Sequence, residues 1–137
     1  MKQLIILVGP PASGKSTYAK QKESEGFIHI SQDIMGRFEY LKHFSVALSS
    51  GKNIIVDRMN FNKQQRKRFI DSGKEMGYTI HVVEFLIAGE ICLERAEKRI
   101  DHPTIKDVET AKKVLKFYWG NYEKPEPNEY NTFEVIK

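Results

Sequence analysis

The sequence has few of the features that mark secreted, membrane-spanning or disordered proteins. Cys92 is the single cysteine among 137 residues, which excludes a disulfide scaffold and favours a small buried apolar role for this thiol. No run approaches the roughly 18 apolar residues of a membrane helix, so we expect no membrane partner. A hydrophobic content of 40% excludes intrinsic disorder. The apolar run 4–8 is short and lacks a cleavage site, so we predict a strand rather than a signal peptide, and a cytoplasmic protein.

Short apolar runs alternate with segments of helical periodicity along the chain. We predict strands over 4–8, 27–30, 53–56, 79–87 and 132–136. The predicted helices are 14–26, 34–50, 62–76, 90–100 and 104–119. This alternation is typical of a parallel sheet with right-handed crossovers. The sequence therefore predicts one α/β domain over residues 1–137, with a parallel sheet of four to five strands and helices on both faces.

A glycine-rich segment follows the first predicted strand. Gly9–Ser16 matches the pattern G-x-x-x-x-G-K-[ST] and opens a predicted helix, which is the context that this motif requires. Glycines let backbone N–H groups turn inward around an anion, and the helix adds the positive end of its dipole. We predict that Lys15 reaches the β- and γ-phosphates of ATP or another NTP and that Ser16 binds Mg²⁺. The motif indicates a P-loop NTPase fold with these nucleotide-binding residues: Gly9, Ala12, Ser13, Gly14, Lys15, Ser16 and Thr17.

Two aspartates lie at the carboxyl ends of predicted strands. Ligands of open α/β sheets bind at these ends. Asp33 comes after the second strand, where a carboxylate can accept the proton of an attacking hydroxyl as a general base. The alternative is that Asp33 caps a helix that begins at Ile34. Asp57 ends the third strand, an arrangement that normally holds the Mg²⁺ shell through water.

Basic residues concentrate on two predicted helices. From Arg58 to Lys74 six basic residues stand against one acid, whereas residues 121–137 carry four glutamates and two lysines. A basic segment beside a nucleotide site favours a phosphate-rich partner, and a solvated helix face is the alternative. Arg95 and Arg99, four residues apart, share one helix face. Such a pair suits a lid that clamps triphosphate oxygens, although an ordinary surface helix has the same pattern.

Together, the loop 9–17, the segment 31–33, the segment 57–61 with Arg66, and the Arg95/Arg99 pair resemble the polynucleotide 5′-hydroxyl kinases. This family includes the kinase domains of end-healing enzymes and of tRNA ligases, and the resemblance spans residues 2–103. It implies transfer of the γ-phosphate of ATP or another NTP to the 5′-OH end of RNA or DNA. The catalytic residues that it implies are Asp33, Lys15, Arg95 and Arg99. The acceptor-binding residues that it implies are Arg58, Asn60 and Arg66.

One position departs from the family pattern. In several relatives, an arginine three residues after the catalytic aspartate binds the acceptor phosphate. Here that position is Gly36, and the arginine comes one residue later, as Arg37. On a helix, this offset rotates the side chain by about 100°, so Arg37 is an acceptor-binding candidate in a shifted position. Asn60 has an alternative role too, since its side chain is suited to hold a loop through backbone hydrogen bonds.

Two other functions stay open at this stage. One is a small-molecule P-loop kinase that phosphorylates a nucleoside, a sugar acid or a similar alcohol. The other is a nucleotide-dependent switch without phosphotransfer. For the polynucleotide kinase, the chain length leaves no room for a fused phosphatase or ligase domain, so we expect such partners to be separate proteins.

Overall fold

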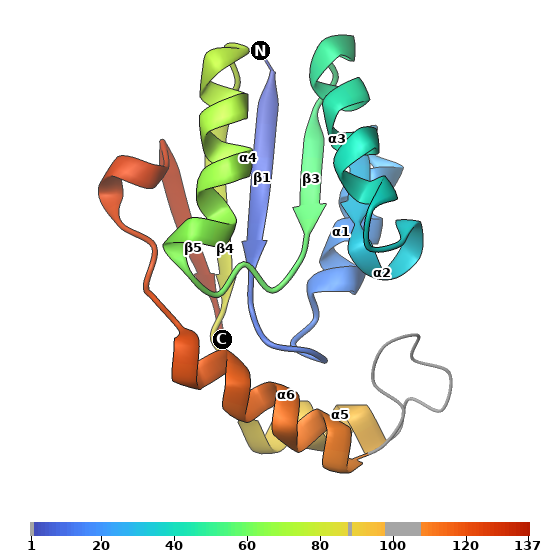
Figure 1. The fold of residues 1–137 in the computed structure, drawn as a ribbon, viewed down its shortest axis with the longest axis vertical. Coiled ribbons are helices and arrows are strands. Elements are labelled where there is room, and N and C mark those ends of the chain that lie inside the picture. Colours follow the sequence, from blue (N-terminus) through green and yellow to red (C-terminus); the bar gives the residue numbers. More distant parts are fainter. Residues whose placement is uncertain (1, 88, 98–107) are drawn as a thin grey trace.

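The computed structural model describes residues 2–87, 89–97 and 108–137. Its centre is a five-stranded sheet in the order β2-β3-β1-β4-β5 (Figure 1). Every neighbouring pair of strands is parallel, which confirms the predicted parallel sheet and α/β fold. The strands are β1 (Gln3–Val8), β2 (Ile28–Ser31), β3 (Ile54–Asp57), β4 (Thr79–Phe85) and β5 (Thr132–Ile136).

Helices connect the strands and cover the sheet. Those described are α1 (Lys15–Ser24), α2 (Gln32–Met35), α3 (Glu39–Ser50), α4 (Lys63–Glu75), α5 (Gly89–Glu97), α6 (Val108–Asn121) and the 3₁₀ turn η1 (Pro127–Glu129). None of the helices within the described ranges is long and apolar enough to cross a membrane.

The side chains of β1 alternate between two hydrophobic cores on opposite faces of the sheet. Leu4 and Ile6 are buried in the core that includes α3 and α4, whereas Ile5 and Leu7 are buried in the core that includes α1. Gly73 lets α4 lie close to β1, because a Cβ at this position would be 2.5 Å from Leu4 Cδ2. Helices therefore cover both faces, as predicted.

The predicted helix 34–50 is wrong in one respect, because it is two helices. Gly36 separates α2 from α3 with φ 96° and ψ 161°, a backbone conformation that is essentially restricted to glycine. The helix α2 also starts earlier than predicted. Ser31 is its N-cap and its side chain accepts a hydrogen bond from the Ile34 backbone N–H (3.4 Å). The alternative role of Asp33 as the cap is therefore wrong.

The helices α5 and α6 lie beyond the carboxyl ends of the strands rather than on a face of the sheet (Figure 1). We refer to this side of the sheet as the carboxyl edge. The described part of α5 ends at Glu97 and α6 begins at Val108. Arg99, the second arginine of the predicted lid pair, lies outside the described residues. The carboxyl edge also carries the phosphate-loop motif, which leaves the end of β1.

Candidate active site

The loop between β1 and α1 (the phosphate loop) depends on glycine for two different reasons. Gly14 has a left-handed backbone, with φ 105°, and the neighbouring Ala12 is also left-handed, with φ 60°. At Gly9 the requirement is space, since a Cβ there would be 2.9 Å from Ser13 Oγ and 3.0 Å from Phe85 Cβ. The backbone is therefore wound tightly at the start of α1, where N–H groups of a helix N-terminus favour an anion.

Two basic side chains contact this loop. The buried Lys15 ammonium donates to the Pro10 carbonyl (2.7 Å). From α5, Arg95 Nη1 donates to the Ala12 carbonyl (3.3 Å). Thr17 lies exposed on the first turn of α1. The structure thus brings Lys15 and Arg95 together on the loop.

A serine and a carboxylate meet beside the loop. Ser16 Oγ donates to Oδ2 of the buried Asp57 (3.1 Å) at the end of β3. A hydroxyl and a carboxylate are hard oxygen donors of the kind that Mg²⁺ binds, and Mg²⁺ usually takes one or two carboxylates together with phosphate oxygens and water. Within residues 2–87, 89–97 and 108–137, no group of three or more His, Cys, Asp or Glu side chains is arranged to hold a metal ion by itself. Ser16 and Asp57 therefore fit Mg²⁺ that is shared with a phosphate.

One buried polar atom of the loop fits the same ligand. Ser13 Oγ is buried and has no hydrogen-bond partner among the described residues. A buried hydroxyl without a partner is costly. A phosphate oxygen at the loop would supply the missing acceptor.

His29 is a residue of this site that the sequence analysis missed. The side chain is buried on β2, and Nε2 lies 2.9 Å from Asp57 Oδ2. Its other ring nitrogen, Nδ1, lies 3.8 Å from Glu23 Oε2 on α1. Sequence spacing gave no sign of a metal ligand. The signal available in the sequence was strand periodicity, which places His29 on the same face as Ser31, two residues later. In the structure Ser31 pairs with Asp57 on the neighbouring strand.

The candidate general base lies at the same edge. Asp33 is exposed in the first turn of α2, two residues after Ser31. Arg58, which follows β3, donates from Nε to Gln32 Oε1 (3.1 Å), and its guanidinium carbon is 4.9 Å from the centre of the Tyr40 ring. Burial lowers the pKa of Arg58, and the negative charge of Asp33 acts in the opposite direction. Arg58 therefore ties the segment that carries Asp33 to the end of β3.

Arg37 lies in the turn between α2 and α3 rather than on a helix. The predicted 100° rotation of its side chain, which assumes a helix, is therefore wrong. The exposed guanidinium carbon lies 5.8 Å from the centre of the Phe38 ring. Arg37 stays an acceptor-binding candidate, now on a turn whose direction Gly36 sets.

Asn60 and Arg66 do not reach the surface, so the structure contradicts the expectation that they bind the acceptor. Asn60 is buried with φ 47°, and Nδ2 donates to the Leu7 carbonyl (2.8 Å). Arg66 is 0% exposed, donates from Nη1 to the Asn60 carbonyl (2.8 Å) and pairs with Glu129 (2.7 Å). The alternative role of Asn60, holding its loop through backbone hydrogen bonds, matches this geometry.

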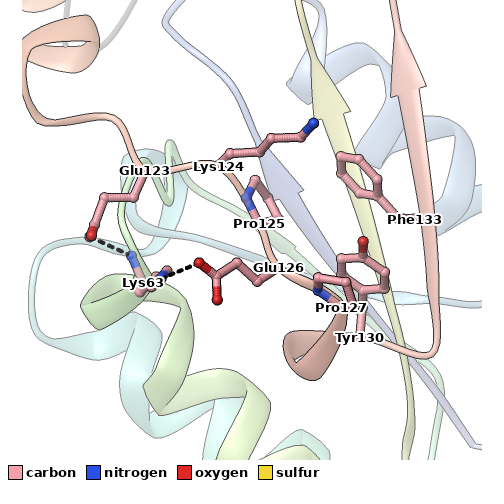
Figure 2. A pocket seen from close by; sticks show the side chains of 8 residues that line it. All are labelled: Lys63, Glu123, Lys124, Pro125, Glu126, Pro127, Tyr130 and Phe133. Carbon is pink, nitrogen blue, oxygen red and sulfur yellow. Dashed lines mark hydrogen bonds and ion pairs between the residues drawn. The ribbon is translucent and has the colours of Figure 1, made fainter.

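Within the basic segment 58–74, Lys63, Arg66 and Lys67 form ion pairs with acidic side chains of the chain itself. On α4, Lys67 pairs with Asp71 (3.0 Å) and Lys74 donates to the Asn128 carbonyl (2.8 Å). Figure 2 shows Lys63 bonded to glutamates of the segment after α6, beside a pocket of about 580 Å³. No residue of the phosphate loop lines this pocket. These cations therefore give little support to the prediction of a phosphate-rich partner.

Comparison with known proteins identifies relatives. A family model described as "AAA domain" matches residues 37–125. The chain is 32% identical over 111 residues to "Transcription factor bHLH140" of Arabidopsis thaliana, covering 74% of this chain and 12% of that protein. It is 28% identical over 109 residues to the "Bifunctional polynucleotide phosphatase/kinase" of Schizosaccharomyces pombe, covering 78% of this chain and 27% of that protein. The chain thus spans less than a third of either relative, and the second confirms the resemblance to polynucleotide kinases.

Solved structures share the fold at low sequence identity. Kti12 of Chaetomium thermophilum, in complex with ADP-AlF3, has a TM-score of 0.67 and 18% identity, covering 97% of this chain and 88% of its own. A gluconokinase of Sinorhizobium meliloti has a TM-score of 0.61 and 16% identity, covering 98% of this chain and 82% of its own. The predicted P-loop NTPase fold is therefore confirmed.

Proposed function

The chain belongs to the AAA domain family, and from this premise we propose that it is a polynucleotide 5′-kinase. It transfers the γ-phosphate of ATP or another NTP to the 5′-OH end of RNA or DNA, and residues 1–137 form one kinase domain. The observation that carries this proposal is the pairing of two groups at the carboxyl edge. An exposed carboxylate, Asp33, lies beside Arg58, and the phosphate loop with Ser16 and Asp57 lies at the same edge.

The donor half of the proposed site binds the triphosphate. Lys15 binds the β- and γ-phosphates, Arg95 contributes a second cation, and backbone N–H groups of the loop donate to phosphate oxygens. Arg99 is proposed to join Arg95 on the resemblance alone. Ser16 and, through water, Asp57 would hold Mg²⁺, which in such sites neutralises charge on the β- and γ-phosphates.

The acceptor half positions and activates the alcohol. The 5′-OH oxygen attacks the γ-phosphorus, the bond from this phosphorus to the bridging β-phosphate oxygen breaks, and the nucleoside diphosphate leaves. The Asp33 carboxylate takes the hydroxyl proton as the new bond forms. Arg37 and Arg58 are proposed to bind phosphates of the acceptor strand, since guanidinium groups match phosphate geometry.

An acceptor panel tests this function. With γ-labelled ATP, we expect label on 5′-OH RNA or DNA oligonucleotides and none on the same oligonucleotides that already carry a 5′-phosphate. For a variant of the proposed base, Asp33→Asn, the matched control is Asp71→Asn, a change at an exposed carboxylate on α4. This control should retain transfer. An enzyme that labels a free nucleoside or gluconate but no oligonucleotide would contradict the proposal.

A small-molecule kinase is the second candidate. It is favoured by the ion pairs and hydrogen bonds that occupy the α4 cations. Salt separates the two candidates, because the KM of a polymeric phosphate acceptor rises steeply with ionic strength whereas that of a neutral alcohol does not. A nucleotide switch without phosphotransfer would label no acceptor at any salt concentration.

A further inference from the structure

The turn between α2 and α3 presents an aromatic ring to solvent. Phe38 is 77% exposed, the largest fraction among the exposed large hydrophobic side chains of the described residues. Ile34, on the other side of Gly36, is 65% exposed. Isolated exposed apolar side chains are common and need no explanation. These two lie within five residues of Asp33, at the carboxyl edge where the acceptor of the proposed reaction must bind.

This turn is fixed in place at both ends by a single side chain. Arg58 bonds Gln32, which precedes Asp33, and stacks on the ring of Tyr40, which follows Phe38. Tyr40 is itself buried in the core. The backbone that carries Phe38 is therefore anchored near Asp33, while the ring itself lies in solvent.

A cation lies beside the ring. The Arg37 guanidinium carbon is 5.8 Å from the centre of the Phe38 ring. Aromatic side chains for bases, together with cations for the backbone, are the combination with which proteins bind single-stranded nucleic acids. In contrast, Val46 of α3 is 70% exposed but has no aromatic surface for stacking.

We infer that Phe38 stacks on the base of the acceptor's 5′-terminal nucleotide and makes the kinase select base-bearing ends. The inference rests on the proposed function and adds a specificity-determining residue to it. The reacting 5′-OH and the base belong to one nucleotide, so an exposed ring on the anchored turn near Asp33 meets the base while Arg37 meets the following phosphate. Stacking depends on the π-face that every base has, so Phe38 accepts any of the bases.

Two acceptors test this inference: matched 5′-OH oligonucleotides, one of which lacks the base of its first nucleotide. With wild type, Phe38→Ala, Phe38→Trp and the control Val46→Ala, the KM and kcat of label transfer from γ-labelled ATP are measured. We expect Phe38→Ala to raise the KM of the base-bearing acceptor about tenfold and to leave its kcat and the KM of the abasic acceptor unchanged. Phe38→Trp should restore the wild-type KM, and Val46→Ala should match wild type.

Other outcomes overturn specific claims. An unchanged KM for Phe38→Ala, with an active wild type, overturns this inference and leaves the proposed function intact. An equal rise for both acceptors has the same consequence, because it means that the ring supports the turn rather than a base. Absence of transfer from wild type to either oligonucleotide overturns the proposed function, and this inference with it.

Discussion

The phosphate loop and the turn between α2 and α3 lie at the same edge of the sheet but are built in opposite ways. In the loop, Lys15 and the neighbouring Ser13 are buried and the backbone is fixed by close packing at Gly9. On α2 and in the turn that follows it, Asp33 and Phe38 are exposed, and one bridging side chain anchors the segment. A triphosphate is common to many reactions and can be bound by backbone, whereas an acceptor has to be recognised by side chains.

Among changes outside the candidate base Asp33, the largest effect is expected on the loop side. Lys15→Ala should lower transfer about 10²- to 10³-fold, because a cation that stabilises developing charge is removed. It should also weaken ATP binding, measured by calorimetry, because Lys15 is proposed to bind the phosphates before transfer as well. Lys116→Ala on the exposed face of α6 is the control. Equal ATP affinity in wild type and Lys15→Ala would break the comparison, since the loop would then not be the donor site.

A second change tests the buried ion pair between Arg66 and Glu129. Arg66→Met should lower the free energy of unfolding by about 3–5 kcal/mol, because it leaves Glu129 partly buried without its partner. Urea unfolding measures this loss, and the double variant Arg66→Met/Glu129→Met should recover part of it. A stable Arg66→Met protein with a raised acceptor KM would instead restore the acceptor role that the buried position argues against.

A third change sharpens the comparison on the acceptor side. Gly36→Ala places an L-residue in a backbone conformation that costs on the order of 1–3 kcal/mol, so the turn should shift. We expect a raised acceptor KM with an unchanged ATP affinity. Gly120→Ala, at an exposed position of α6 where the added Cβ would meet nothing within 4 Å apart from the adjoining helix backbone, should be neutral or stabilising by roughly 0.5–1 kcal/mol. Weakened ATP binding in Gly36→Ala would mean that the two halves are not independent.

The smallest effect concerns Tyr118 of α6, whose ring lies against that of Phe61 in the loop after β3. Burial, followed by the charge of Glu84, raises the pKa of Tyr118 far above its usual range. Above about pH 10 the unfolded chain therefore loses a proton that the folded protein keeps, and the free energy of unfolding falls as pH rises. Tyr118→Phe should make this decline shallower.

At neutral pH the same variant should change the free energy of unfolding by less than about 0.5 kcal/mol. The reason is that the Tyr118 hydroxyl has no hydrogen-bond partner within the described part of the chain. Urea unfolding at several pH values measures both effects. A large loss of stability at neutral pH would show that this hydroxyl has a partner.

Local patterns predicted the sheet and the phosphate loop. Strands β1 and β3 are short, mainly apolar runs, and the loop motif is contiguous, so neither depends on knowing which distant residues meet. The order of the strands places Ser16 next to Asp57, and a parallel sheet alone predicts that both lie at its carboxyl edge. The buried position of Cys92 was also predicted, from the usual burial of a free cysteine.

Partners that are distant in sequence were not predictable. The cations of α4 looked like a polymer-binding face, but their glutamate partners lie about 60 residues further along the chain. The charge reversal after residue 121 was visible in the sequence, whereas the pairing of Arg66 with Glu129 depends on where η1 folds back. The contacts of Arg58 with both sides of the turn at Gly36 were likewise not visible in the sequence.

The most direct test of the account compares ATP affinity and phosphate transfer in one preparation of Asp33→Asn. Asparagine keeps the size of the side chain but cannot take the hydroxyl proton. The account predicts an ATP Kd within about twofold of wild type and a loss of transfer to a 5′-OH oligonucleotide of about 10²- to 10⁴-fold. Wild-type transfer by Asp33→Asn would contradict it, because no carboxylate at residue 33 would then be needed.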